Sequence, residues 1–169
     1  TVTVINGLTN TIINTFIVGA DPSALIYDSI DDRIYCSDGR PGVVSVLDGS
    51  SNSVLATIDV GQYAAALAHN TMNNKIYCAS RGNASEIDSV SIIDSVNNSV
   101  ITTIPVGTSP FALTYNPTNN KVYCANCGSN SVTVIDGAAN SIITTIATDD
   151  CPCALVYNPT NNKIYCANK

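Results

Sequence analysis

The side chains with the most reactive chemistry in this sequence are its seven cysteines. Four of them directly follow a tyrosine, at Cys36, Cys78, Cys124 and Cys166. The other three, Cys127, Cys151 and Cys153, break that pattern. Three interpretations are open: a disulfide from Cys127 to Cys151 or Cys153, a zinc site that adds Cys124, or free thiols. The zinc interpretation is weakened because Cys124 belongs to the recurring set, and residues three apart on a strand point to opposite faces.

Charged side chains that could bind a ligand gather in a few short segments. One pair, Asp149 and Asp150, occupies a junction where similar segments carry small or apolar residues. A second group lies around Ser80–Asp88, a segment four residues longer than its counterparts. The predicted ligand-binding residues are Asp21, Asp38, Arg40, Arg81, Glu86, Asp88, Asp149 and Asp150. Taken one at a time, each is more simply explained as a solvated loop charge.

Catalytic patterns do not stand out in the sequence. The lone histidine, His69, occupies a position that holds Tyr27, Tyr115 and Tyr157 in the similar segments, so we interpret it as a packing residue. No Ser/His/Asp arrangement, glycine-rich phosphate loop or paired-carboxylate motif is visible. We therefore expect no catalytic residues, no bound metal, no cofactor and no enzymatic activity.

Two segments match the pattern for attachment of a glycan to asparagine. They are Asn83-Ala-Ser85 and Asn97-Asn-Ser99, and both lie in expected loops. Chance matches are common in a chain this rich in Asn and Ser. Asn83 and Asn97 are candidate glycosylation sites.

The chain consists of four copies of one sequence repeat. Tyr157–Asn168 is nearly a copy of Tyr115–Asn126, and weaker copies begin at His69 and Tyr27. The tyrosines of the Tyr-Cys pairs recur at intervals of 42 to 46 residues. A period of this length indicates stacked supersecondary units.

Each repeat holds four short segments rich in Val, Ile, Thr and Tyr, a composition typical of β-strands. In chain order they are centred on an Ala-Leu pair, on the Tyr-Cys pair, on a segment like Val132–Asp136 and on a segment like Ser141–Ile146. Asn-, Asp-, Gly- and Pro-containing turns separate them. No segment has the periodicity of an amphipathic helix. Four linked strands per repeat predict the blades of a β-propeller.

The repeat resembles the YVTN β-propeller family. Tyr123-Cys-Ala-Asn126 and Tyr165-Cys-Ala-Asn168 stand where that family carries its signature, with cysteine in place of valine. The flanking Asn-Pro-Thr-Asn-Asn-Lys and Ser-Val-Thr-Val-Ile-Asp-Gly segments are similar to the family consensus as well. This resemblance covers the whole chain and implies a surface-layer-like protein.

The order of the segments predicts how the ends meet. The chain starts with the last two strands of a repeat and stops after the first two, so the halves sum to a fourth blade. We expect one domain, residues 1–169, folded as an all-β propeller of four four-stranded antiparallel blades. Lys163–Asn168 would pair with Thr1–Asn6 and close the ring, which removes unpaired sheet edges. The alternative is a segment of a longer repeat array.

This arrangement also groups the candidate residues. Connections into the first strand and out of the second strand of a repeat share one rim, which collects the eight predicted ligand-binding residues and brings Cys127 near Cys151 and Cys153. We therefore favour a disulfide, which forms in oxidising locations. Charged residues are 12% of the chain, and the formal net charge is −6, so nucleic acid is not an expected partner. No apolar run is long enough to span a membrane.

The leading functional hypothesis is a non-catalytic building block of a cell-surface or extracellular assembly, such as a surface layer or a filament, formed by self-association. In that case a terminal strand pair would be donated to a neighbouring copy. The alternative is a module that binds a glycan, a peptide or a cation with the acidic rim. A hydrolase-type propeller enzyme is the third hypothesis, and the chain offers it only one histidine.

Overall fold

The protein is an all-β structure, described here by a computed structural model that covers residues 1–83 and 86–169. Its complete sheets each contain four antiparallel strands in chain order. The first holds β3 (Pro22–Asp28), β4 (Arg33–Asp38), β5 (Val43–Asp48) and β6 (Val54–Asp59). The second holds β7 (Ala64–Asn70), β8 (Lys75–Ser80), β9 (Ser89–Asp94) and β10 (Ser99–Pro105). The third holds β11 (Pro110–Asn116), β12 (Lys121–Asn126), β13 (Ser131–Asp136) and β14 (Ser141–Ala147).

A two-stranded sheet lies at each end of the chain. One pairs β1 (Val2–Ile5) with β2 (Ile12–Phe16), and the other pairs β15 (Pro152–Asn158) with β16 (Lys163–Asn168). We call the four-stranded sheets blades and these two sheets the open blades. In the described residues the one helical element is a 3₁₀ turn, η1 (Cys127–Ser129), in agreement with the absence of helical periodicity.

Asparagine and aspartate side chains shape the hairpins. Between β5 and β6, the Asp48 carboxylate accepts the backbone N–H groups of Ser50 (3.1 Å) and Ser51 (2.6 Å). Asn52 completes this turn with a positive φ of 55°, a conformation that Asn tolerates better than most residues. The equivalent acceptors are Asn6, Asp94 and Asp136, and the equivalent positive-φ residues are Asn10, Asn98 and Asn140. The repeated Asn and Asp residues therefore explain the repeated turns.

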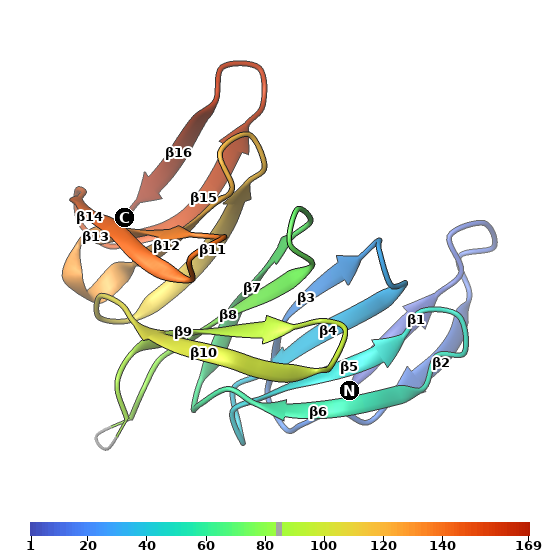
Figure 1. Cartoon of the computed structure of the whole chain (residues 1–169). Coiled ribbons are helices and arrows are strands. Elements are labelled where there is room, and N and C mark those ends of the chain that lie inside the picture. Colours follow the sequence, from blue (N-terminus) through green and yellow to red (C-terminus); the bar gives the residue numbers. More distant parts are fainter. Residues whose placement is uncertain (84–85) are drawn as a thin grey trace.

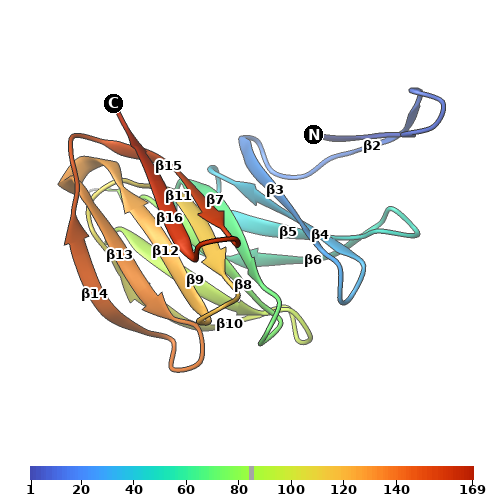
Figure 2. The same cartoon turned by 90° about the horizontal axis from the view of Figure 1, so that it is seen from above.

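The sheets stand side by side in an arc (Figures 1 and 2). The first strand of each repeat lies innermost, so that β3, β7, β11 and β15 pack against one another in that order. The remaining strands of each blade extend outward to β6, β10 and β14. This is the blade arrangement that the repeat predicted.

Neighbouring complete blades bury the faces that they turn toward each other, while their outermost strands stay largely exposed. Tyr35 packs with Ile76 and Cys78 between the first and second blades, while Tyr77 packs with Cys124 and Ile135 between the second and third. Cys36, Cys78 and Cys124 are buried, as expected for small apolar residues in this position. Cys166 differs because it lies in an open blade, and it is only half-buried.

The predicted closed ring is not confirmed. β1 pairs with β2, β16 pairs with β15, and the two open blades share no ladder. The two ends of the arc lie apart (Figure 2). Side chains packed between successive blades fix the rotation from one blade to the next, and that rotation does not bring the ends together within this chain. The structure therefore shows three blades flanked by two open blades, with sixteen strands in total over the described residues.

Candidate functional site

The predicted rim is present. The loops that enter the innermost strands lie beside the loops that leave the second strands, and backbone hydrogen bonds join them. Val60 N–H donates to the Gly42 carbonyl (3.0 Å), Val106 N–H to that of Asp88 (3.0 Å), and Thr148 N–H to that of Asn130 (2.9 Å). The sequence therefore placed these loops correctly relative to one another.

Several predicted ligand-binding carboxylates instead hold the backbone of this rim. Asp38 is fully buried, and its carboxylate accepts the N–H groups of Asp21 (3.1 Å) and Arg40 (3.0 Å). Asp88 accepts the N–H groups of Gly82 (2.7 Å) and Ser109 (2.9 Å). These two carboxylates are thus occupied by backbone donors.

The same device recurs in the other two loops. The Glu86 carboxylate accepts the N–H of Gln62 (3.1 Å), and the Asn130 side-chain oxygen accepts the N–H of Cys151 (2.9 Å). Asp150 in turn accepts from the Asn130 side-chain amide (2.9 Å). Each innermost strand is therefore preceded by a backbone N–H that a side chain from the neighbouring loop satisfies. Among the predicted acidic residues, Asp21 and Asp149 keep exposed carboxylates without a hydrogen-bond partner in the described residues.

The two predicted arginines stack on aromatic rings that the sequence analysis did not select. The Arg40 guanidinium lies 5.3 Å from the ring centroid of Tyr63 and donates to its hydroxyl (3.3 Å). The Arg81 guanidinium lies 5.0 Å from the ring centroid of Phe111, and Lys169 lies 5.6 Å from the same ring. Phe111 stands where the other repeats have Ser, Ala or Cys. Phe111 could therefore have been identified from the sequence, because its residue type departs from the repeat.

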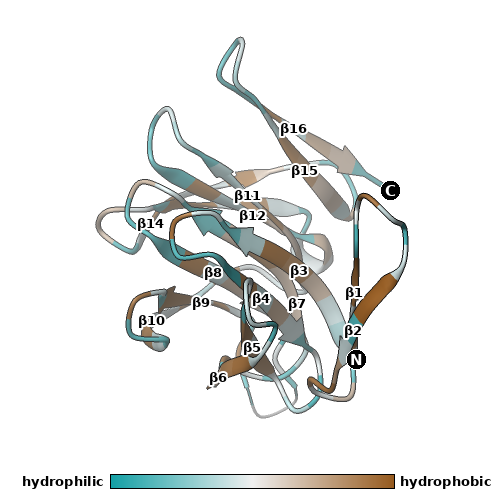
Figure 3. Cartoon of the chain, turned by 90° about the vertical axis from the view of Figure 1, so that its right-hand side faces the viewer, coloured by the Kyte–Doolittle hydropathy of each residue, from teal (hydrophilic) through white to brown (hydrophobic). Residues whose placement is uncertain are grey.

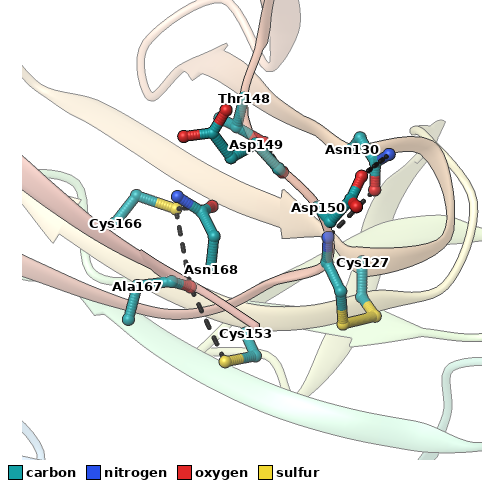
Figure 4. Close-up of a disulfide and its surroundings, with 10 residues drawn as sticks. Cys127, Asn130, Thr148, Asp149, Asp150, Cys153, Cys166, Ala167 and Asn168 are labelled. Atoms are coloured by element: carbon teal, nitrogen blue, oxygen red, sulfur yellow. Dashed lines mark hydrogen bonds between the residues drawn. A yellow bond between two sulfur atoms is a disulfide. The ribbon is translucent and has the colours of Figure 1, made fainter.

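A disulfide occupies the equivalent place at the third blade boundary. Cys127 is bonded to Cys151, one of the two pairings that the sequence left open, and this bond ties the third blade to the open blade β15–β16 (Figure 4). Cys153 is free, and its thiol points toward the Ala167 carbonyl (3.6 Å). The zinc interpretation fails because Cys124 is buried in the core and Cys127 is consumed by the disulfide. In the part of the chain that the structure describes, no group of three or more Cys, His, Asp or Glu side chains could hold a metal.

His69 bridges two blades and is more than a packing residue. Its Nε2 atom lies 3.4 Å from the fully buried carboxylate of Asp28 and 3.2 Å from the side-chain oxygen of Asn74. In the next repeats the position of Asp28 is held by Asn70 and Asn116, whose amides donate to an asparagine of the following blade. At this boundary Asp28 takes the place of the first asparagine of that pair, Asn74 keeps the place of the second, and His69 contacts both.

The structure describes the whole of one candidate glycosylation pattern and only the asparagine of the other. Asn83 is exposed, but Ala84 and Ser85 lie outside the described residues. Asn97 is exposed in the turn between β9 and β10, where its side-chain amide donates to the Asp94 carboxylate (2.8 Å). Both asparagines lie in loops, as expected.

The open blades expose side chains that the complete blades bury. Tyr165 in β16 is 49% exposed, whereas its equivalents Tyr35 and Tyr77 are 0% exposed and Tyr123 in the third blade is half-buried. Ile5 in β1 is 62% exposed, whereas the equivalent Ile135 is 0% exposed. Each open blade therefore presents an unpaired strand edge together with apolar side chains, and apolar residues run along β1 and β2 in Figure 3.

A groove lies next to β1, where a complete blade would have its two inner strands. It has a volume of about 300 Å³, and its lining includes Val2, Val4, Leu25 and Ile34. Leu25, on the neighbouring strand β3, is 58% exposed. A shallower hollow lies on the face of β15–β16, with Leu155, Val156 and Tyr165 in its lining.

No family model matches this chain, and no curated protein sequence matches it. The resemblance to the YVTN family therefore has no support from those comparisons. Among solved structures, Kuenenia stuttgartiensis Hydrazine Synthase is similar with a TM-score of 0.80 and 22% identity, over 93% of this chain and 45% of that chain. The structure of U3-55K is similar with a TM-score of 0.71 and 14% identity, over 88% of this chain and 52% of that one.

Both of these structures are propeller-like, and at such low identity they establish the fold alone: this chain has a β-propeller-type fold. It spans about half the length of either chain. We expected that the protein is not an enzyme. This expectation is overturned, because a structure with a similar fold, hydrazine synthase, is by name an enzyme. Enzymes and other proteins share this architecture, so the fold and the missing motifs do not exclude catalysis.

Proposed function

We propose that residues 1–169 form one propeller-type interaction domain, similar to YVTN proteins, that acts as a building block of an extracellular or cell-surface assembly. Its contact surfaces are the open blades, each of which takes up a further pair of β-strands. Addition of strands to an exposed sheet edge is a common mode of protein recognition, since the main-chain hydrogen bonds supply affinity and the side-chain pockets supply specificity.

The observation that carries this proposal is the contrast between equivalent residues. Tyr165 and Ile5 are half to two-thirds exposed. In the complete blades the equivalents of Ile5 are buried, and those of Tyr165 are buried (Tyr35 and Tyr77) or half-buried (Tyr123). Burying an apolar side chain of this size contributes about 1.5–3 kcal/mol. An unpaired edge also leaves backbone N–H and C=O groups ready to bind another strand. Completion of the open blades is therefore strongly favoured.

Two features support an extracellular or cell-surface location. The Cys127–Cys151 disulfide is a bond that persists in oxidising compartments and is rare in the cytosol. Asn83 and Asn97 are exposed and begin glycosylation patterns. Over the residues described, the structure contains no helix with the length and apolarity needed to cross a membrane.

The test is the particle mass of the purified chain, measured by light scattering over a range of concentrations. We expect masses above the 17.6 kDa of a single copy, growing with concentration. Tyr165→Lys places a charge at the open edge and should return the mass to that of one copy. Thr160→Lys adds the same charge in the exposed turn between β15 and β16 and should behave as wild type. A wild-type chain that stays monomeric, or a Tyr165→Lys chain that still associates, would refute the proposal.

A second candidate function, ligand binding at the rim, is favoured by one groove. It has a volume of about 560 Å³, and its lining includes Asp59, Glu86, Ser89 and Thr103. Carboxylates and hydroxyls of this kind suit the hydroxyl groups of a glycan. Glycan-array binding by the wild type that is lost in Glu86→Lys and kept in Asp149→Lys would establish this function. Equal binding by all three proteins, or none by any, would dismiss it.

A further inference from the structure

The strand pair that completes each open blade can be identified from the chain's own complete blades. We infer that it is the opposite open blade of a second copy, with β16 of one copy paired antiparallel to β1 of the next. This inference rests on the proposed function and names the partner at the same surfaces.

The sequences of the two open strands reproduce an interface that the chain already contains. β1 reads Val-Thr-Val-Ile, identical to Val132–Ile135 in β13. β16 reads Lys-Ile-Tyr-Cys-Ala-Asn and differs from β12 only in having Ile164 where β12 has Val122. In the third blade β12 and β13 are paired along their whole length. The contact between two copies would thus repeat a contact that forms within one copy.

This template also fixes the register. In the third blade Tyr123 lies opposite Val134, and Cys124 lies opposite Thr133. The first and second blades have the same alignment, with Cys36 opposite Ser45 and Cys78 opposite Ser91. Transferred to the contact between copies, the register places Tyr165 opposite Val4 and Cys166 opposite Thr3. A shift by one residue would turn the apolar side chains to the wrong face.

The spaces and the side chains fit the same arrangement. The groove beside β1 lies where the two inner strands of a complete blade would be. Leu25 of β3 lines this groove and is 58% exposed. The pair β15–β16 consists of two inner strands and carries two large exposed side chains, Val156 (60%) and Tyr165 (49%). Docking β15–β16 of one copy into the groove beside β1 of another would cover Leu25 as well as Val156 and Tyr165.

The distribution of charge permits this contact between copies that each carry a net charge of −6. All thirteen acidic residues lie between Asp21 and Asp150. Residues 1–20, which include β1 and β2, carry no charged side chain, and residues 152–169, which include β15 and β16, carry only Lys163 and Lys169. Asp48 is the one acidic residue in the lining of the groove, and β15–β16 carry no carboxylate side chain that would meet it. The contact therefore brings no two carboxylate side chains together, although the molecule as a whole is acidic.

The same chain does not supply its own partner, because its open blades lie at opposite ends of the arc and share no ladder (Figures 1 and 2). Pairing β16 with β1 of another copy is a head-to-tail contact between two different surfaces. Such a contact leaves one free β1 and one free β16 on every dimer, so that growth continues into a filament or a larger ring.

The test uses the natural thiol of Cys166. In Thr3→Cys the new thiol would lie opposite Cys166 of the next copy, at a separation that a disulfide can span. Val4→Cys is the matched control, because the adjacent side chain on a strand points to the opposite face. Each variant is treated with oxidised glutathione and examined on a non-reducing gel. We expect Thr3→Cys to give a ladder of cross-linked chains at least about tenfold stronger than that of Val4→Cys.

Further readouts separate the inference from the proposal beneath it. The ladder should disappear in Thr3→Cys/Cys166→Ser and on reduction, and peptide mass spectrometry should identify the 3–166 link. A 3–166 link within a single chain would overturn the second copy as partner. Association in light scattering without the 3–166 link would overturn the register while the proposed function stands. A chain that is monomeric and not cross-linked would overturn both.

Discussion

At the scale of single residues, this protein uses side-chain oxygens to satisfy its backbone. Asp48 and Asp136 accept N–H groups in the outer hairpins, and Asp38 and Asp88 do so on the loop rim. Buried or half-buried N–H groups need such partners, since an unsatisfied donor costs about 1–3 kcal/mol. The many Asn and Asp residues in a chain with little charge are therefore explained by its turns.

The pH dependence of stability tests this use of carboxylates at Asp48. Hydrogen bonds from the Ser51 backbone N–H, then from the Ser51 and Ser50 hydroxyls, lower the pKa of Asp48 from 3.8 to about 2. Between these values the unfolded chain binds more protons than the folded chain, so the stabilisation is complete above 3.8 and is lost as the pH falls toward 2. In urea unfolding, the free energy of wild type should decrease over that window. Asp48→Asn should be less stable than wild type near pH 5 and should lose less on acidification. Parallel pH profiles for the two proteins would contradict this.

The rim residues show where reasoning from the sequence stops. Charge and loop position selected Asp38 as a ligand-binding residue, but the structure buries it against the N–H of Asp21. A sequence reports that a carboxylate is present in a loop and not which donor lies in reach. Tyr63 and Phe111 were missed because aromatic residues occur both in cores and on surfaces. Only the arginines stacked on their rings show that they belong to the rim.

At the scale of elements, the strands and hairpins follow from local signals, and the closure of the ring does not. Every repeat has its turn residues at the same positions, so the strands and their pairing within a blade could be derived. Closure depends on small rotations between blades, which are set by packing of residues such as Tyr77 against Ile135. These rotations accumulate over the arc and leave no local trace in the sequence.

Each blade boundary on the rim is fastened by different chemistry. The first uses Arg40 on Tyr63, the second uses Arg81 on Phe111, and the third uses the disulfide of Cys127 and Cys151. A cation above an aromatic ring contributes about 0.5–2 kcal/mol, whereas a disulfide across a loop of this length contributes about 3 kcal/mol. Among these three rim contacts, the one at the third boundary, which holds the open blade β15–β16, is therefore the strongest.

Removal of the disulfide tests this difference. Cys151→Ser should lower the free energy of unfolding in guanidinium chloride by about 3 kcal/mol, because the unfolded chain gains the freedom of a loop with a sequence separation of 24 residues. Reduction of the wild type should cause a similar loss. Cys153→Ser, which removes a free thiol two residues away, should unfold within about 0.5 kcal/mol of wild type. Equal stability of Cys151→Ser and Cys153→Ser would show that the bond does not fasten this boundary.

At the scale of the whole molecule, burial and charge are both unevenly distributed. The middle of the arc buries its apolar residues between blades and carries every acidic side chain. The two ends expose apolar residues on unpaired strands and carry none. Large exposed apolar surfaces mark interaction sites, and here they coincide with free sheet edges. The end formed by β1–β2 is thus built as the outer half of a blade, and the end formed by β15–β16 as the inner half.

Thiol reactivity reports whether those ends become covered. Burial raises the pKa of Cys78 and of Cys124 to about 12, so neither thiol should react with iodoacetamide in the native protein near pH 8.5. Cys166 occupies the same position in its repeat but is only half-buried, so it should be alkylated in dilute solution. When copies associate, pairing of β16 with another strand should reduce its labelling to the level of Cys124, while Tyr165→Lys should keep Cys166 reactive. Peptide mass spectrometry measures each site, with guanidinium-unfolded protein as the fully labelled control. Labelling of Cys166 that is independent of protein concentration would show that β16 stays uncovered.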